Sequence, residues 1–154
     1  PAPAAPAAAT KRPAAQYHLN EAQPKLRTVG LYIGTREMEA EVCLTLTEIA
    51  TGLMFRPEIG PDDGMLFVFG RPHRTEFYMK NVQFDIAAAY IDPEGVILEI
   101  VQLKKQIETP VPSKADNVQF VLETAPDFFS RNGLGPGTLI RTKRGSLKES
   151  FNLK

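Results

Sequence analysis

Lys80, Asn81 and Asp85 are the residues of this chain whose types and spacing best fit a binding site. They follow Tyr78, which a strand pattern places on the same face as Lys80. An amine, an amide and a carboxylate beside an aromatic ring can together hold a sugar or a carboxylated ligand. The alternative is structural: Lys80 and Asp85 form an ion pair, and Asn81, which tolerates unusual backbone angles, shapes the turn.

Arg56 and Glu123 complete the set of candidate ligand-binding residues. The planar guanidinium of Arg56 can bind a carboxylate or a phosphate through two parallel hydrogen bonds. It could instead form an internal salt bridge that anchors a helix to the sheet, with Asp62, Asp63 or Glu123 as the expected partner. Glu123 could point inward beside the Lys80 region, or simply end its strand. The candidate set is Arg56, Tyr78, Lys80, Asn81, Asp85 and Glu123.

No set of residues indicates a catalytic centre. A glycoside hydrolase needs two carboxyl groups about 5 to 10 Å apart across a cleft, and Asp85 and Glu123 would be the pair. Because the sequence does not fix their separation, we assign no catalytic residue. The chain has no nucleophile elbow and no phosphate-binding loop. His18 and His73 belong to no spaced ligand set, so we expect no metal and no cofactor.

The composition argues against further classes of function. Lys plus Arg is 18 and Asp plus Glu is 18, so the formal net charge is zero. Nucleic acids and anionic membranes need a basic surface, and we therefore expect neither as the main partner. No stretch is apolar for long enough to span a membrane. The single cysteine, Cys43, excludes a disulfide framework and fits its strand as a small apolar residue.

The chain divides into a linker, residues 1–24, and one domain, residues 25–154. The first residues alternate Pro and Ala without an apolar period, which is typical of an extended linker. Such linkers often follow a removed signal peptide or a lipid anchor. We therefore expect a periplasmic or extracellular protein, tethered through this linker.

The elements that would position the candidate residues mostly have the period of strands. Met65, Phe67 and Phe69 would point to one side and Leu66 and Val68 to the other, which predicts a central strand with both faces buried. The pattern also predicts strands at 25–33, 37–44, 75–80, 85–91, 96–103, 118–123 and 138–142, with an edge strand at 150–153. In the strand at 37–44, Leu44 would share the inner face.

Turns and caps indicate how the strands connect. Asp92-Pro93-Glu94-Gly95 is a turn sequence that predicts a hairpin between two of the strands. Thr45 or Thr47 would cap a short helix. A second helix is expected at 125–132, with Thr124 as its cap. Together these signals predict a mainly β fold, an antiparallel or mixed β-sandwich or open barrel of about seven or eight strands with two short helices.

Several motifs in this order resemble the family called domain of unknown function 192, which comprises small, often exported bacterial and archaeal domains. The resemblance covers residues 27–142. It rests on GLMFR (52–56), GMLFVF (64–69), FYMKN (77–81), D-I…Y-I-D (85–92), and LE followed by a helix and G-x-G-P-G (122–137). Similar sequences usually have Trp in place of Tyr78 and Thr-x-x-Pro-Leu after the Asn, where this chain has Val82-Gln83-Phe84. The resemblance implies a compact β-rich fold and no settled substrate, cofactor or reaction.

The leading functional hypothesis is a non-catalytic, exported domain that binds a small ligand or a component of the cell envelope. The first alternative is a hydrolase acting on glycan or envelope material, with Asp85 and Glu123 as its carboxyl groups. The second is a structural or protein-interaction module that uses an exposed sheet edge or apolar patch. The oligomeric state stays open.

Overall fold

The computed structural model describes residues 17–154, so the first part of the predicted linker lies outside the described residues. The last part of that linker contacts the folded chain. The backbone N–H of Leu19 donates to Thr51 Oγ1 at 2.9 Å, and Gln23 Nε2 donates to the carbonyl of Gly52 at 2.9 Å. The division of the chain into linker and domain stays a prediction.

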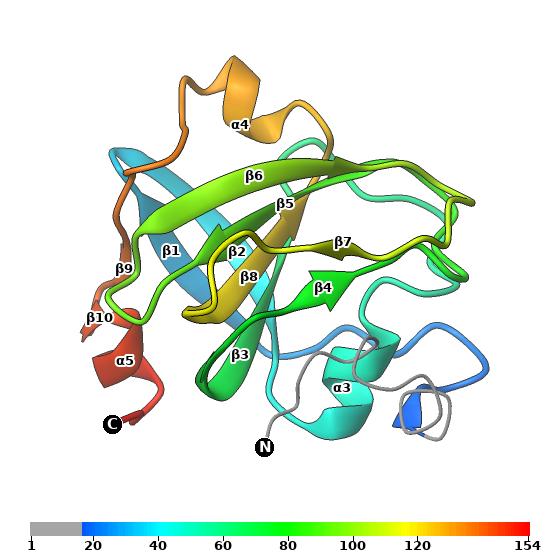
Figure 1. Ribbon diagram of the computed structural model, residues 1–154, viewed down its shortest axis with the longest axis horizontal. Coiled ribbons are helices and arrows are strands. Elements are labelled where there is room, and N and C mark those ends of the chain that lie inside the picture. The colour runs from blue at the N-terminus through cyan, green and yellow to red at the C-terminus, as the bar shows by residue number, and fades with distance from the viewer. Residues whose placement is uncertain (1–16) are drawn as a thin grey trace.

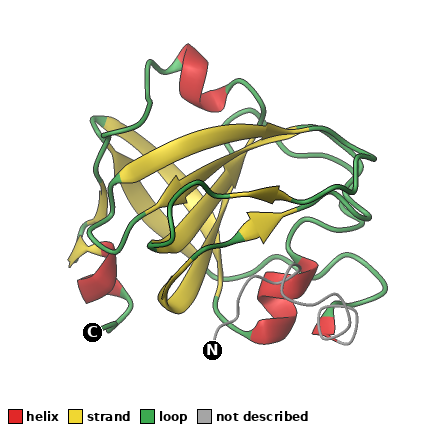
Figure 2. Ribbon diagram, in the orientation of Figure 1, coloured by secondary structure: helices red, strands yellow, loops and turns green. Residues whose placement is uncertain are grey.

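The described part of the chain is mainly β, which confirms the predicted fold class (Figure 2). Eight strands form one sheet in the order β10-β9-β1-β2-β3-β8-β5-β6, and β4 and β7 form a separate ribbon. The sheet contains β1 (Thr28–Ile33), β2 (Arg36–Cys43), β3 (Gly64–His73), β5 (Ile86–Ile91), β6 (Ile97–Leu103), β8 (Val118–Thr124), β9 (Ile140–Thr142) and β10 (Gly145–Ser146). The ribbon consists of β4 (Glu76–Phe77) and β7 (Val111–Pro112), and the helices are α3 (Leu46–Thr51), α4 (Phe128–Arg131) and α5 (Leu147–Ser150).

The sheet is mixed and curls into an open barrel (Figure 1). Strands β2 and β3 are parallel and are connected through α3, whereas the other pairs of the sheet are antiparallel. At one end, the residues before β6 meet those before β9: Val96 and Leu139 form an isolated bridge, and the N–H of Ile140 donates to Gly95 at 2.8 Å. These contacts link the two sides without a continuous ladder.

Strand β3 has a core on each of its faces, as its alternation predicts. Met65, Phe67 and Phe69 belong to one buried cluster, and Leu66 and Val68 belong to the other. Both neighbours of β3, which are β2 and β8, lie inside the sheet. The strand is therefore central, and its aromatic face is the one that contributes to the candidate site.

The second buried strand, β5, is joined to β6 by the predicted hairpin. The N–H of Gly95 donates to the carbonyl of Asp92 at 3.0 Å, and the Asp92 carboxylate accepts from the amides of Glu94 and Val96, each at 2.9 Å. Asp92 therefore has the turn-forming role expected of the first residue of such a turn.

Helix α3 begins at a capping box that resolves which threonine is the cap. The N-cap is Thr45, whose hydroxyl accepts from the N–H of Glu48, while the Glu48 carboxylate accepts from the N–H of Thr45. The strand before it ends at Cys43, so Leu44 lies in the connection and is 43% exposed. The expectation that Leu44 faces the core is therefore wrong.

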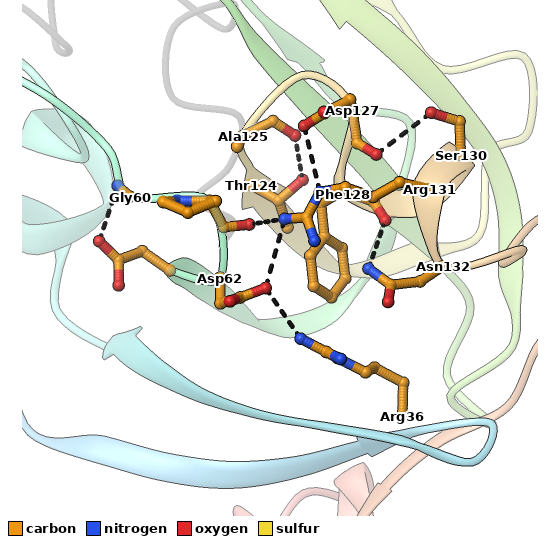
Figure 3. A network of polar contacts seen from close by, with 12 residues as sticks. Arg36, Gly60, Asp62, Thr124, Ala125, Asp127, Phe128, Ser130, Arg131 and Asn132 are labelled. Carbon is orange, nitrogen blue, oxygen red and sulfur yellow. Dashed lines mark hydrogen bonds and ion pairs between the residues drawn. The ribbon is translucent and has the colours of Figure 1, made fainter.

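Helix α4 is shorter than predicted and is anchored by a polar network (Figure 3). Its N-cap is Asp127, whereas Thr124 remains in β8. Asp62 accepts from Arg36 at 2.8 Å and from Arg131 at 3.3 Å. Arg131 also donates to the carbonyl of Pro61. The network therefore ties α4 to the loop before β3 and to the start of β2.

The edge strand predicted at 150–153 is absent, because helix α5 occupies the residues up to Ser150 and a turn follows it. Ser146 caps the helix by accepting from the N–H of Glu149 at 3.1 Å, and Glu149 bonds back to the N–H of Ser146 at 2.9 Å. This capping box is a local signal, S-x-x-E, that favours a helix over extension. Leu147 is buried in the core, which fixes the helix against the sheet.

The β4–β7 ribbon is shorter than the strand predicted at 75–80 and crosses in front of the sheet (Figure 1). The buried Thr75 accepts from the N–H of Ser113 at 2.7 Å, and its own N–H donates to the Ser113 hydroxyl. Tyr90, from β5, donates its hydroxyl proton to the carbonyl of Val111 at 2.6 Å. These contacts hold the ribbon over the aromatic face of the sheet.

Candidate functional site

A small cavity lies where α3, the ribbon and the sheet meet. It has a volume of about 40 Å³. Its lining residues are Ile49, Ala50, Thr51, Gly52, Leu53, Met54, Phe67, Glu76, Phe77, Tyr78, Val82 and Glu123. Ala50, Glu76 and Tyr78 are partly exposed and form its rim, while the remaining lining residues are buried. We call it the Glu123 cavity.

Glu123 is held in the middle of the sheet. On β8 it is in register with Met65 of β3 on one side and with Ala88 of β5 on the other. Its side chain is 5% exposed. Within residues 17–154, neither a hydrogen bond nor an ion pair reaches its carboxyl group, and burial alone raises its pKa to about 8. A buried carboxyl without a partner is costly and therefore marks a functional candidate.

One wall of the cavity comes from the end of α3 and requires a glycine. Gly52 has φ +46, and a Cβ there would lie 3.1 Å from the ring of Phe67. The side chain of Gln23 donates to the carbonyls of Glu48 and Gly52 at 3.2 and 2.9 Å, which fixes this turn. The last turn of α3 is therefore held against the aromatic face of β3.

Aromatic rings form much of the remaining wall. The rings of Phe67 and Phe77 meet edge to face with centroids 5.1 Å apart, and Phe77 also contacts Tyr90 at 6.4 Å. Tyr78 lies at the rim, where burial raises the pKa of its hydroxyl. Phe67 and Phe77 therefore belong to the buried core and also line the cavity.

Of the six candidates, Tyr78 and Glu123 line this cavity together, and Asn81 lines a different hollow. That hollow has a volume of about 310 Å³ and includes Lys105 and Glu108. Asn81 has φ +61, its carbonyl accepts from the N–H of Phe55 at 2.8 Å, and its amide contacts the sulfur of Met54 at 3.8 Å. Asn81 therefore shapes the turn, as the structural alternative predicted.

Arg56 forms an internal salt bridge, but with a partner that the sequence did not indicate. Its guanidinium donates to both carboxylate oxygens of Glu41, at 2.7 and 2.9 Å. Burial raises the pKa of Glu41, but the hydrogen bonds from Arg56 and from the N–H of Leu26, together with the charges of Arg56 and Lys25, hold the pKa below its ordinary value. The expected partners Asp62, Asp63 and Glu123 are replaced because β2 places Glu41 beside the start of the 56–63 connection.

Asp85 and Lys80 do not form the expected pair. The carboxylate of Asp85 lies 3.8 Å from Lys104 Nζ and accepts from the N–H of Lys105 at 2.9 Å. Lys80 is partly exposed and is not among the residues that line the Glu123 cavity. The structure therefore separates Lys80 and Asp85 from Tyr78 and Glu123.

Sequence reasoning missed two polar members of the cavity, Glu76 and Thr51. Glu76 alternates with Tyr78 in the sequence, but nothing in the sequence shows that β4 crosses the sheet above Glu123. Thr51 lies at the end of α3, where its hydroxyl accepts from Leu19. Both depend on contacts between segments distant in the chain, which local patterns do not encode.

A larger hollow of about 720 Å³ runs along β1 and β2 and reaches Thr142, Lys143 and Arg144. Its charged residues, which include Glu37 and Glu39, are exposed. None of the six candidate residues lines it, so it gives no support to the sequence-predicted site.

Residues 29–142 match the sequence pattern of the domain of unknown function 192, described as an uncharacterised ACR. The chain belongs to the domain of unknown function 192 family. The match includes Tyr78, Asn81 and Glu123, and it confirms the resemblance seen in the sequence. No curated protein matches the chain.

Two solved structures share the fold of this family member. One is from Sinorhizobium meliloti and is proposed to be a transcription regulator: it is 25% identical, with a TM-score of 0.74, and the match covers 78% of this chain and 97% of that one. The other is a protein of unknown function from Novosphingobium aromaticivorans: it is 28% identical, with a TM-score of 0.71, and the match covers 78% and 90%.

Among the helices of residues 17–154, none combines the length and apolarity needed to cross a membrane. The same residues contain no group of three or more His, Cys, Asp and Glu side chains placed to hold a metal ion.

Proposed function

We propose that this domain is a non-catalytic binding module that takes the end of a small ligand into the Glu123 cavity. The observation that carries the proposal is the Glu123 carboxyl, which is buried and has no partner within residues 17–154. The described residues supply no donor to this carboxyl group, so its hydrogen-bonding capacity is left for whatever occupies the cavity. A ligand that donates to Glu123 inside this mostly apolar lining gains a hydrogen bond, which gives the site a source of affinity.

The size of the cavity limits what part of the ligand it can hold. A water molecule needs at least about 10–15 Å³ of such volume, so 40 Å³ corresponds to about three water molecules. A whole sugar ring is several times larger. The cavity therefore suits a narrow group of two or three non-hydrogen atoms, with the rest of the ligand lying outside near Ala50, Glu76 and Tyr78.

The hydrolase alternative receives no support from the placement of its two carboxyl groups. Glu123 lines the cavity, whereas Asp85 is not among its lining residues. Its carboxylate is engaged by Lys104 and Lys105. The transcription role proposed for the Sinorhizobium relative also finds no basis in the charge of this chain, because the net charge is zero.

The test is thermal stabilisation of the full chain by a library of amines, alcohols, organic acids, sugars and nucleotides. We expect one chemical class to raise Tm with increasing dose, because a ligand that binds only the folded state stabilises it. Glu123→Gln keeps the size of the side chain and should abolish the effect. Glu58→Gln, a change at an exposed glutamate, is the matched control and should retain it.

The proposal fails if no compound shifts Tm, or if Glu123→Gln responds as strongly as the control. A shift lost in Lys80→Ala but retained in Glu123→Gln would move the site to the region first suggested by the sequence.

We also propose that the domain works in the periplasm or outside the cell, where envelope components would supply ligands. The Pro- and Ala-rich composition of residues 1–15 supports this location. Immunodetection of the protein in the cytoplasmic fraction alone would count against it.

A further inference from the structure

The groups around the Glu123 cavity have a consistent electrostatic character. Two carboxyl groups line it, Glu123 from β8 and Glu76 from β4. None of the described residues in its lining is Lys, Arg or His. The lining of the cavity therefore carries two acidic groups and, among the described residues, no basic side chain.

Its apolar walls also favour a cation. The lining includes the rings of Phe67, Phe77 and Tyr78. The face of an aromatic ring attracts an organic cation, and the attraction strengthens when water is excluded. Together with two acids, these rings fit a positively charged group that carries some hydrocarbon.

We propose that the group recognised in the Glu123 cavity is a primary ammonium at the end of an unbranched alkyl chain, an inference that rests on the proposed function above. The ammonium would donate to the carboxylate of Glu123, and its first carbons would lie between Phe67, Phe77 and Tyr78. Glu76 would add a second negative charge at the rim.

Size and ligand number separate this group from other cations. Ca²⁺ takes six to eight oxygen ligands and Mg²⁺ takes about six. Two separate carboxyl groups among aromatic side chains supply fewer oxygen ligands than either ion needs. A quaternary ammonium with four methyl groups exceeds the two or three non-hydrogen atoms that a cavity of about 40 Å³ admits. A primary ammonium with one or two methylene groups fits.

Binding of an ammonium should release a proton from Glu123. With the site empty, burial raises the pKa of Glu123 to about 8, so its carboxyl group holds a proton at neutral pH. A cation beside it favours the carboxylate, and the proton leaves to solvent as the ligand enters. The other titratable groups around Glu123 are Glu76 from β4, Tyr78, Tyr90 from β5 and Cys43 from β2. The pKa values of Tyr78, Tyr90 and Cys43 are all raised, so these three groups stay neutral below about pH 8.

The experiment is calorimetric titration of the full chain with n-propylammonium and, as an uncharged analogue of similar size, 1-propanol. We expect the affinity for propylammonium to rise by up to about tenfold per pH unit below about pH 8, with release of up to about one proton per ligand. Buffers of different ionisation enthalpy measure that proton. Glu123→Gln should abolish binding, Glu76→Gln should weaken it several-fold, and Glu58→Gln should leave it unchanged.

Two further ligands sharpen the result. Tetramethylammonium should bind at least about tenfold more weakly than propylammonium, because it exceeds the cavity. The amide of Nα-acetyl-lysine has the same primary ammonium at the end of an alkyl chain, carried on an amino acid. If it binds more tightly than propylammonium, the natural ligand is a lysine side chain of a polypeptide. If it binds equally or more weakly, the natural ligand is a free amine.

The inference is overturned if propylammonium does not bind, or if it binds without pH dependence or proton release. A second outcome is that propylammonium does not bind, whereas 1-propanol or another neutral compound binds and loses its binding in Glu123→Gln. The proposed binding function then stands and the ammonium assignment falls. If the compound library also fails to shift Tm, both fall.

Discussion

Glu41 and Glu123 show how position decides what a glutamate does in this molecule. Glu41 receives two hydrogen bonds from Arg56 and one from the N–H of Leu26, and with the charges of Arg56 and Lys25 they keep its pKa below the ordinary value against the effect of burial. Glu123 is more deeply buried, receives no such bonds from the described residues, and has a raised pKa. A paired carboxylate stabilises the fold, whereas the oxygens of an unpaired carboxyl group remain able to accept hydrogen bonds from a ligand.

The pKa of Glu123 predicts how stability depends on pH. It is about 8 in the folded protein and 4.5 in the reference state, so between these values the folded state holds a proton that the unfolded state has released. The free energy of unfolding should therefore fall as pH rises from about 4.5 to about 8, by a maximum on the order of 5 kcal/mol, and level off above. Glu123→Gln lacks this titration and should exceed the native protein in stability at about pH 9.

Urea unfolding of the native chain and of Glu123→Gln, at about pH 5 and about pH 9, measures the effect as a difference. The difference between the free energies of unfolding of the two proteins cancels the titration of Glu48 and Glu41, because both proteins contain these residues. If the free energies of unfolding of the two proteins change with pH in parallel, Glu123 has an ordinary pKa in the folded protein and the prediction is wrong.

At the scale of elements, α3 is the part that builds the cavity wall, and it is held at both ends. Its start is fixed by the capping box of Thr45 and Glu48, and Glu48 is also paired with Arg27 at 2.7 Å. Those hydrogen bonds, led by the one from Arg27, lower the pKa of Glu48 to about 2. Its end is fixed by Gln23. A helix of six residues has little stability of its own, so these contacts determine where it lies.

The cap can be tested with two neighbouring threonines that the sequence left as alternatives. Thr45→Ala removes the hydroxyl that accepts from Glu48 N–H and should lower the free energy of unfolding by about 1 kcal/mol. Thr47→Ala changes the same residue type within the helix without removing a cap and should cost less than about 0.5 kcal/mol. Equal losses in denaturant titrations would show that the capping hydrogen bond contributes nothing to stability.

At the scale of the whole molecule, the sequence predicted what alternation and turn chemistry determine. The period of two from Met65 to Phe69 identified a central strand, because only a strand buried on both faces tolerates apolar residues at every position. The Asp92–Gly95 turn identified the β5–β6 hairpin. Tyr78 and Glu123 were selected for their types, and they do lie together at one cavity.

What the sequence did not predict depends on contacts between distant segments. The partner of Arg56 is Glu41 because β2 runs beside the start of the long connection to β3, and several acids were equally plausible from spacing alone. Glu76 reaches the cavity because the ribbon docks across the sheet through Ser113 and Tyr90. Helix α5 is a different case, because its capping box, Ser146 with Glu149, is a local signal that the sequence does contain.

The near-closure of the barrel yields a prediction about the molecule as a whole. Gly95 has φ +90, and a Cβ there would lie 2.6 Å from the carbonyl oxygen of Ile140. Gly137 has φ +93, but a Cβ there would meet no atom within 4 Å. Both glycines lie where β6 and β9 approach one another, so alanine at either should cost similar backbone strain, on the order of 1 kcal/mol.

Only Gly95→Ala should also force the two sides of the barrel apart. We expect it to lower the free energy of unfolding by at least about 2 kcal/mol more than Gly137→Ala, and to speed hydrogen exchange at the amides of Ile97 and Ile140. Those amides donate across the junction at 2.9 and 2.8 Å, so their protection reports its closure directly. If both variants lose the same stability and Ile140 stays protected in Gly95→Ala, the sheet is held by its ladders alone and the junction does not contribute to its curvature.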